Sequence, residues 1–149
     1  MKLGIFIQNS FSNWLLDLSK IFGLTSKFTG ITIAIICFIR ANIIGRALEE
    51  LKNHERIHVQ QYWEVTVAFL LPIVYFGLIW GISMWWILPA FVMYYVIYLL
   101  NFWWERRKTN SVFAYRRIRF EAEAYQNDTN DNYLGHRKPF AWLFIKILF

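Results

Sequence analysis

The chain has 149 residues, enough for one domain, and it is 57% hydrophobic and 20% aromatic, more than a soluble domain of this size usually carries. Its 16 lysines and arginines against 10 acidic residues give a net charge of +6, which suits an anionic lipid surface or a nucleic acid. The single cysteine, Cys37, excludes an internal disulfide and a cysteine-based zinc cluster. Any metal site must therefore use histidine and carboxylate ligands.

The N-terminal region, residues 1–27, contains apolar residues at helical spacing behind a candidate Ser12 cap. They are Trp14, Leu15, Leu18, Ile21 and Phe22. This pattern predicts a short amphipathic helix that ends at Gly23. Such a helix either lies on a membrane surface or packs against the rest of the protein.

Residues 28–46 predict a strand region. The apolar run 31–39 is too short to span a membrane and is rich in β-branched side chains, so it favours a strand. Residues 41–46 then predict a connector or a short return strand. A helix signal begins at Ala47 and runs through Lys52.

Residues 65–104 form a long segment without a charged side chain. As one helix it would extend about 60 Å, roughly twice the thickness of the hydrocarbon core of a bilayer. The segment therefore predicts a transmembrane hairpin, with helices over 61–80 and 84–104 that Pro72 and Pro89 would kink. Tryptophans near the predicted ends are typical of an interfacial belt: Trp63, Trp80, Trp85, Trp86, Trp103 and Trp104.

The charges around the hairpin predict its orientation. Lys52 and Arg56 precede the first span and the turn is uncharged, whereas several basic residues follow the second span: Arg106, Arg107, Lys108, Arg116, Arg117 and Arg119. By the positive-inside tendency both termini are expected in the cytoplasm. Lipid headgroups account for these cations, so no nucleic-acid partner is expected.

The helix before the first span carries a His-Glu-x-x-His motif, His54-Glu55-Arg56-Ile57-His58. This spacing places two imidazoles one turn apart on the same helix face with a carboxylate beside them, an arrangement typical of catalytic zinc. The alternative is that both histidines only bind headgroups at the interface.

A catalytic zinc needs a third protein ligand besides water. Glu64 stands at the position used by His-Glu-x-x-His-x-x-Gly-x-x-His enzymes, but Gln61 replaces the glycine that turns the chain, so Glu64 is expected to point away. Glu121 and Glu123 are better candidates, because a hairpin returns their segment to the side of the histidines. The alternative for both is pairing with nearby arginines on a surface helix.

The sequence HERIHVQQ at 54–61, followed after the hairpin by EAEAY at 121–125, resembles the gluzincin metalloproteases. It is most similar to the integral-membrane CAAX-protease type, with HExxH and a later ExxAD. It also resembles small uncharacterised bacterial membrane proteins with HERIH and FExEAY motifs. The resemblance implies a bacterial inner-membrane location and Glu121 as the third zinc ligand. The family's supporting aspartate is Tyr125 here, which removes one outer partner of the metal site.

These patterns predict a single, mainly α membrane domain over residues 1–149. It comprises the interfacial region 1–27, the strand region 28–46, the motif helix and hairpin 47–104, and the second motif segment with its C-terminus 105–149. The last residues, 140–149, are apolar but too short to span, so they are expected in the interface or packed on the hairpin.

The expected function is zinc-dependent hydrolysis of a peptide bond in a peptide or membrane-protein substrate, with Glu55 as general base. The strand over 31–39 is a candidate platform for an added substrate strand. Candidate oxyanion donors or outer partners of the metal site are Tyr125, Tyr133, His136, Arg116 and Glu123. The alternatives are a non-catalytic membrane subunit that packs against partner subunits, and a lipid-modifying hydrolase.

Overall fold

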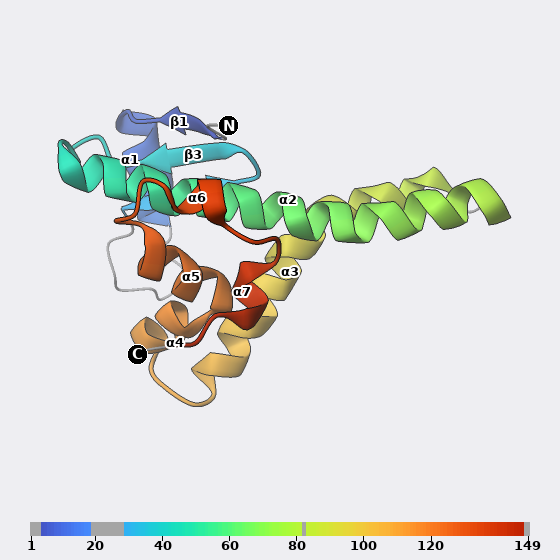
Figure 1. Ribbon diagram of the computed structural model, residues 1–149. Helices are drawn as coiled ribbons and strands as arrows, with labels where there is room; N and C mark the ends of the chain where they lie inside the picture. Colours follow the sequence, from blue (N-terminus) through green and yellow to red (C-terminus); the bar gives the residue numbers. More distant parts are fainter. Residues whose placement is uncertain (1–3, 19–28, 82, 148–149) are drawn as a thin grey trace.

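The computed structural model describes residues 4–18, 29–81 and 83–147. It is mainly helical, with a long helical hairpin that carries a small sheet and several short helices at one end (Figure 1). The first arm, α2 (Arg46–Trp80), is one helix of 35 residues, so the motif helix and the first predicted span are continuous through Pro72. It ends at Gly81, whose φ of 65° is a left-handed cap that glycine adopts without a Cβ clash.

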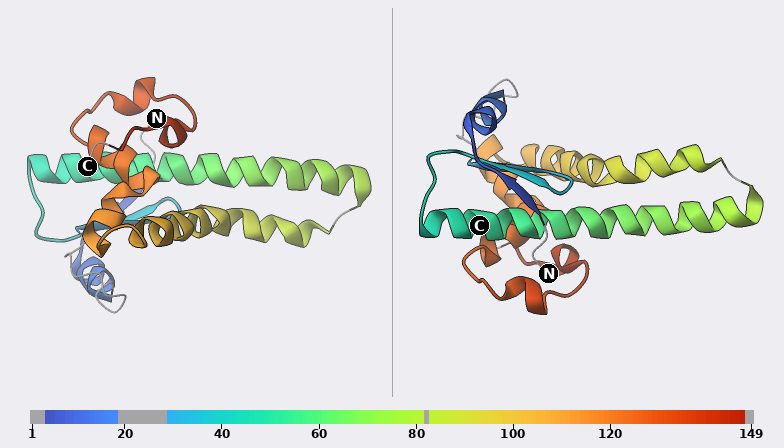
Figure 2. Two further views of the ribbon diagram at one scale, coloured as in Figure 1. Left: turned by 90° about the horizontal axis from the view of Figure 1, so that it is seen from below. Right: turned by 90° about the horizontal axis from the view of Figure 1, so that it is seen from above.

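The second arm consists of the 3₁₀ turn η2 (Met84–Trp86) and α3 (Ile87–Arg106). Both α2 and α3 are long and apolar enough to cross a membrane. Only 11% of the most apolar stretch of each helix is buried within the molecule, whereas a core helix of a soluble protein is mostly buried. The far half of the hairpin extends beyond all other described elements (Figure 2).

The sheet contains β1 (Ile5–Ile7), β2 (Gly30–Ile33) and β3 (Ile36–Ile39) in the order β1-β3-β2. β1 is parallel to β3, and β2 is antiparallel to it. The prediction of one strand over 31–39 is therefore wrong, because the run folds back on itself at Ala34, which has a φ of 54°. Alanine is the one residue between Ile31 and Ile36 without a branched Cβ, so it takes this left-handed position most readily. Residues 41–45 form a connector, and α2 begins at the next residue.

The N-terminal helix, α1 (Ser10–Leu18), begins two residues before the predicted cap. Asn9 caps it, since Asn9 Oδ1 accepts a hydrogen bond from Ser12 N at 3.0 Å. Phe11 and Trp14 are 53% and 58% exposed whereas Leu16 is buried, so one face of the helix packs and the other is open. The predicted positions Ile21 and Phe22 lie outside the described residues.

After α3 the chain forms short helices: α4 (Ser111–Arg117), α5 (Arg119–Asn127), α6 (Tyr133–His136) and α7 (Ala141–Phe144). The sheet and these helices lie on different sides of the N-terminal half of α2 (Figures 1 and 2). Trp142 of α7 is buried, with its ring 4.4 Å from that of Phe120, so this part of the C-terminal segment packs on α5. This apolar contact holds α5 against α2 and α3, together with Tyr62, Val65, Tyr94 and Ile118.

Candidate metal centre

The two motif histidines and Glu121 converge in the interior of the protein, between α2 and α5. All three are buried, and their ligand atoms lie within 4.8 Å of one another. The histidines meet because a spacing of four residues places them on one face of α2. Glu121 reaches them because the preceding residue of α5, Phe120, is held in the apolar core.

The distances between the donor atoms fit a small metal ion. His54 Nε2 and His58 Nε2 are 3.1 Å apart, and each lies 3.3 Å from an oxygen of Glu121. Ligands about 2.0–2.1 Å from a tetrahedral zinc lie roughly 3.3–3.4 Å from each other. Glu121 Oε2 is also buried without a hydrogen bond, so an acceptor is left for a cation. Two imidazole nitrogens and one carboxylate are a donor set that suits catalytic zinc.

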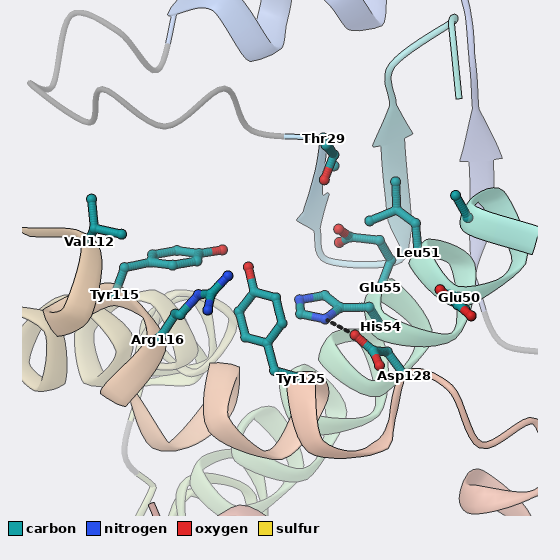
Figure 3. A pocket seen from close by; sticks show the side chains of 12 residues that line it. Thr29, Glu50, Leu51, His54, Glu55, Val112, Tyr115, Arg116, Tyr125 and Asp128 are labelled. Atoms are coloured by element: carbon teal, nitrogen blue, oxygen red, sulfur yellow. Dashed lines mark ion pairs between the residues drawn. The ribbon is translucent and has the colours of Figure 1, made fainter. Parts of the chain in front are cut away.

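Additional groups orient these ligands. Asp128 Oδ2 lies 3.8 Å from His54 Nδ1 (Figure 3). The other ring nitrogen, Nε2, is the one beside His58 and Glu121. The hydroxyl of Tyr98 donates a hydrogen bond to Glu121 Oε1 at 2.8 Å. Partners of this kind fix the orientation and basicity of metal ligands. Asp128 therefore lies where it can support the site from outside the ligand set.

The electrostatics of the cluster favour a positive charge at its centre. Burial disfavours a charged imidazole, but the carboxylates of Asp128 and Glu121 raise the pKa of His54 to about 10. Burial likewise opposes ionisation of Glu121, yet the positive charges of the adjacent His58 and His54 imidazoles hold the pKa of Glu121 below its usual range. Without a metal, protons on the histidines supply this charge; a bound metal replaces them.

Glu55 is buried beside this cluster and points to a different neighbour, the strand β2. Thr32 Oγ1 donates a hydrogen bond to Glu55 Oε2. The other oxygen, Oε1, lies so close to Gly30 that a Cβ there would collide with it. The strand thus fixes the carboxylate while Glu55 stays outside the ligand cluster.

A cavity of about 390 Å³ opens next to the cluster. It is lined by His54 and Glu55 from α2, by Thr29 and Gly30 at the start of β2, and by residues of α4 and α5. From α4 and α5, the side chains of Tyr115, Arg116 and Tyr125 project into this space toward the motif helix (Figure 3). Burial raises the pKa of Tyr125 to about 12, so its hydroxyl stays protonated at neutral pH and can donate a hydrogen bond.

Comparison with protein-family models, with curated proteins and with solved structures finds no match for the chain.

Other predicted site residues lie away from the cavity lining. His136 is exposed on α6, with its Nδ1 3.3 Å from the Asn132 carbonyl. Tyr133 donates to Glu123 Oε1 at 2.8 Å, and Glu123 pairs with Arg137 instead of the arginines near residue 117. Glu64 also pairs with Arg137, so it points away from the histidines as expected.

Sequence reasoning missed Asp128, Tyr98, Tyr115 and Thr32. Asp128 had a detectable signal, because it follows Glu121 by seven residues and thus shares its helix face. Thr32 and the tyrosines had none, since their roles depend on which segments pack together.

Proposed function

We propose that the protein is a zinc-dependent membrane peptidase that hydrolyses a peptide bond with a metal-activated water. The observation that carries the proposal is the cluster of His54, His58 and Glu121, whose donor atoms are spaced for one metal ion beside a cavity. Glu55 lines the same cavity without belonging to the cluster. This arrangement separates ligands from base, as metal-assisted hydrolysis requires.

In this proposal, His54, His58 and Glu121 would hold the zinc ion, which would supply Lewis-acid activation of a water molecule and of the scissile carbonyl. Glu55 Oε1 takes the proton from the attacking water, because Thr32 already occupies Oε2. The same carboxyl group then delivers the proton to the leaving amine nitrogen. Tyr125, Tyr115 and Arg116 are the donors that face the cavity and can stabilise the developing oxyanion.

The sheet edge beside the cavity favours a peptide substrate over a lipid ester. Arg40 N donates to Thr29 O at 3.0 Å, so these two residues face each other as a hydrogen-bonded pair next to the antiparallel strands β2 and β3. Along such strands, hydrogen-bonded pairs alternate with pairs that make no hydrogen bond to each other. The backbone groups of Gly30 and Thr32 therefore point away from β3. Within the described residues β2 is an edge strand, so these groups can pair with an extended peptide. The substrate backbone would then lie beside Glu55.

The hairpin supports a location at a membrane surface. The twenty-two positions from His58 to Trp80 correspond to about 33 Å of helix, close to the roughly 30 Å of a bilayer's hydrocarbon core. With Trp80 at the far interface, the metal centre lies at the near one. A peptide segment at the membrane surface is thus the substrate that this site reaches best.

The hairpin also predicts that both termini lie on one side of the membrane, which we propose to be the cytoplasmic side of a bacterial inner membrane. Cysteine-accessibility labelling, or reporter fusions at Met1 and Phe149, should report the same side for both ends. Opposite sides would exclude the hairpin topology. Labelling at the outer face alone would reverse the proposed orientation.

The protein purified in detergent and returned to lipid vesicles should contain about one zinc per chain and cleave peptides, with activity lost on chelation and restored by zinc. Replacing Glu121 by alanine should lower zinc affinity by more than about 100-fold. Loss of a residue that only supports a metal ligand lowers affinity by up to about 100-fold, and loss of a ligand itself should have a larger effect. Glu50→Ala is the matched control, because Glu50 lines the same cavity without belonging to the cluster.

Three outcomes would contradict the peptidase. Firm zinc binding without cleavage of peptides or lipid esters would indicate a metal-binding subunit. Cleavage of lipid esters alone would indicate a lipid hydrolase. A metal-free protein that purifies only with stoichiometric partners would indicate a structural subunit.

A further inference from the structure

A chain of buried polar groups leads from the metal ligand His58 to the C-terminal segment. Gln61 Oε1 lies 2.8 Å from His58 Nδ1. The amide nitrogen of Gln61 donates to two acceptors, Phe120 O and Glu123 Oε2, each at 3.0 Å. Gln61 and Glu123 are fully buried, so water cannot replace any of these partners.

The two acceptors fix which way the Gln61 amide points. Its nitrogen must face Phe120 and Glu123, because neither a carbonyl nor a carboxylate oxygen can donate a hydrogen bond. Its oxygen must then face His58, so the hydrogen in that contact comes from His58 Nδ1. Tyr94 Oη is the other group near this nitrogen, at the longer distance of 3.5 Å.

A hydrogen on Nδ1 has a direct consequence for metal binding. In the neutral imidazole only one nitrogen carries hydrogen, so Nε2 keeps its lone pair. Nε2 is the atom that faces His54 Nε2 and Glu121. Gln61 therefore holds His58 in the tautomer and ring orientation that a metal ligand needs.

Arg137 anchors this arrangement from outside. Its guanidinium pairs with both oxygens of Glu123 and with both oxygens of Glu64. The side chain of Arg137 is 2% exposed and that of Glu123 is 0% exposed. Tyr133 adds a hydrogen bond to Glu123 Oε1 at 2.8 Å. Glu123 is thus fixed as the acceptor that orients the Gln61 amide.

We propose that Gln61 is a positioning residue of the metal centre, which sets the His58 tautomer through a relay of Glu123 and Arg137. The proposal rests on the proposed zinc site and deepens it. It also gives a role to the second glutamate of the EAEAY motif, which the hydrolytic mechanism does not use.

The test uses the full chain labelled with ¹⁵N-histidine in lipid nanodiscs. In the wild type, NMR should detect a slowly exchanging Nδ1 proton on His58, which variants of the three histidines assign. Gln61→Leu should lose this signal and bind zinc about 10- to 100-fold more weakly. Gln60→Leu is the matched control at the adjacent position, where no hydrogen bond ties the side chain to the relay; it should change neither.

A second variant separates hydrogen bonding from packing. Gln61→Met keeps the length of the side chain but offers His58 no acceptor and Glu123 no donor. It should lose the His58 signal and bind zinc about 10- to 100-fold more weakly, as Gln61→Leu does. If Gln61→Leu fails to fold, Gln61→Met tests the relay in its place, and a Gln61→Met variant that keeps both the signal and the zinc affinity counts against it.

The proposal is overturned if the wild type lacks the Nδ1 signal, or if Gln61→Leu keeps both the signal and the affinity. The wild type could instead show the signal, and Gln61→Leu could lose it, although the wild type binds no zinc at any concentration. This result would refute the proposed peptidase while supporting the positioning of His58 by Gln61.

Discussion

Replacing Glu55 by glutamine is expected to slow peptide hydrolysis by about 10²- to 10⁴-fold while zinc content stays unchanged. The amide cannot accept a proton from the attacking water, and Glu55 is not part of the ligand cluster. Zinc content and the rate of cleavage should be measured on the same preparation. Loss of zinc in this variant would make Glu55 a ligand and would require the site to be redrawn.

Gly30→Ala is a second substitution that should slow hydrolysis without removing zinc. A Cβ at position 30 would collide with Glu55 Oε1, so the base must move although no ligand is altered. We expect reduced hydrolysis with zinc retained. Gly135→Ala is the matched control, because its Cβ would meet no atom within 4 Å. Equal activity in the two variants would show that β2 does not position the base.

Replacing Arg137 by methionine is expected to reduce the free energy of unfolding by roughly 3–5 kcal/mol. Methionine fills similar space but removes the cation that two buried carboxylates, Glu64 and Glu123, share. Uncompensated charges in the interior are costly. Denaturant unfolding in detergent micelles measures the effect.

Arg46→Met is the control for this prediction. Arg46 also pairs with a glutamate, Glu50, but its side chain is 85% exposed, so its loss should change stability by less than about 1 kcal/mol. In a protein that already carries Glu64→Gln and Glu123→Gln, Arg137→Met should reduce the free energy of unfolding much less than it does in the wild type. An equally large loss in that background would assign the effect to packing instead of charge.

Local sequence was sufficient for the features that depend on chain direction and spacing. The spacing of His54 and His58 fixes one shared face of a helix, whatever surrounds it. The uncharged segment 65–104 is longer than one bilayer crossing would need, and this length predicts a turn within it. The two arms of the hairpin, the motif helix and the short N-terminal helix were therefore predicted close to their observed places.

The sheet was predicted only in part. A run of β-branched residues indicates a strand, but it does not say where the chain reverses, and Ala34 is a weak turn signal. β1 pairs in parallel with β3, which lies more than thirty positions later in the chain. The residues of a short strand do not indicate which distant segment it will pair with.

The carboxylate ligands show the same division between sequence and tertiary structure. By itself the sequence determined that the hairpin returns the EAEAY segment to the side of the histidines. It left Glu121 and Glu123 as candidates, and only the resemblance separated them. In the folded protein, the packing of Phe120 against Trp142 fixes the rotation of α5 and thereby determines which of the two glutamates faces the histidines. Two residues apart on a helix, the glutamates point in nearly opposite directions, so Glu121 meets the histidines while Glu123 meets Arg137.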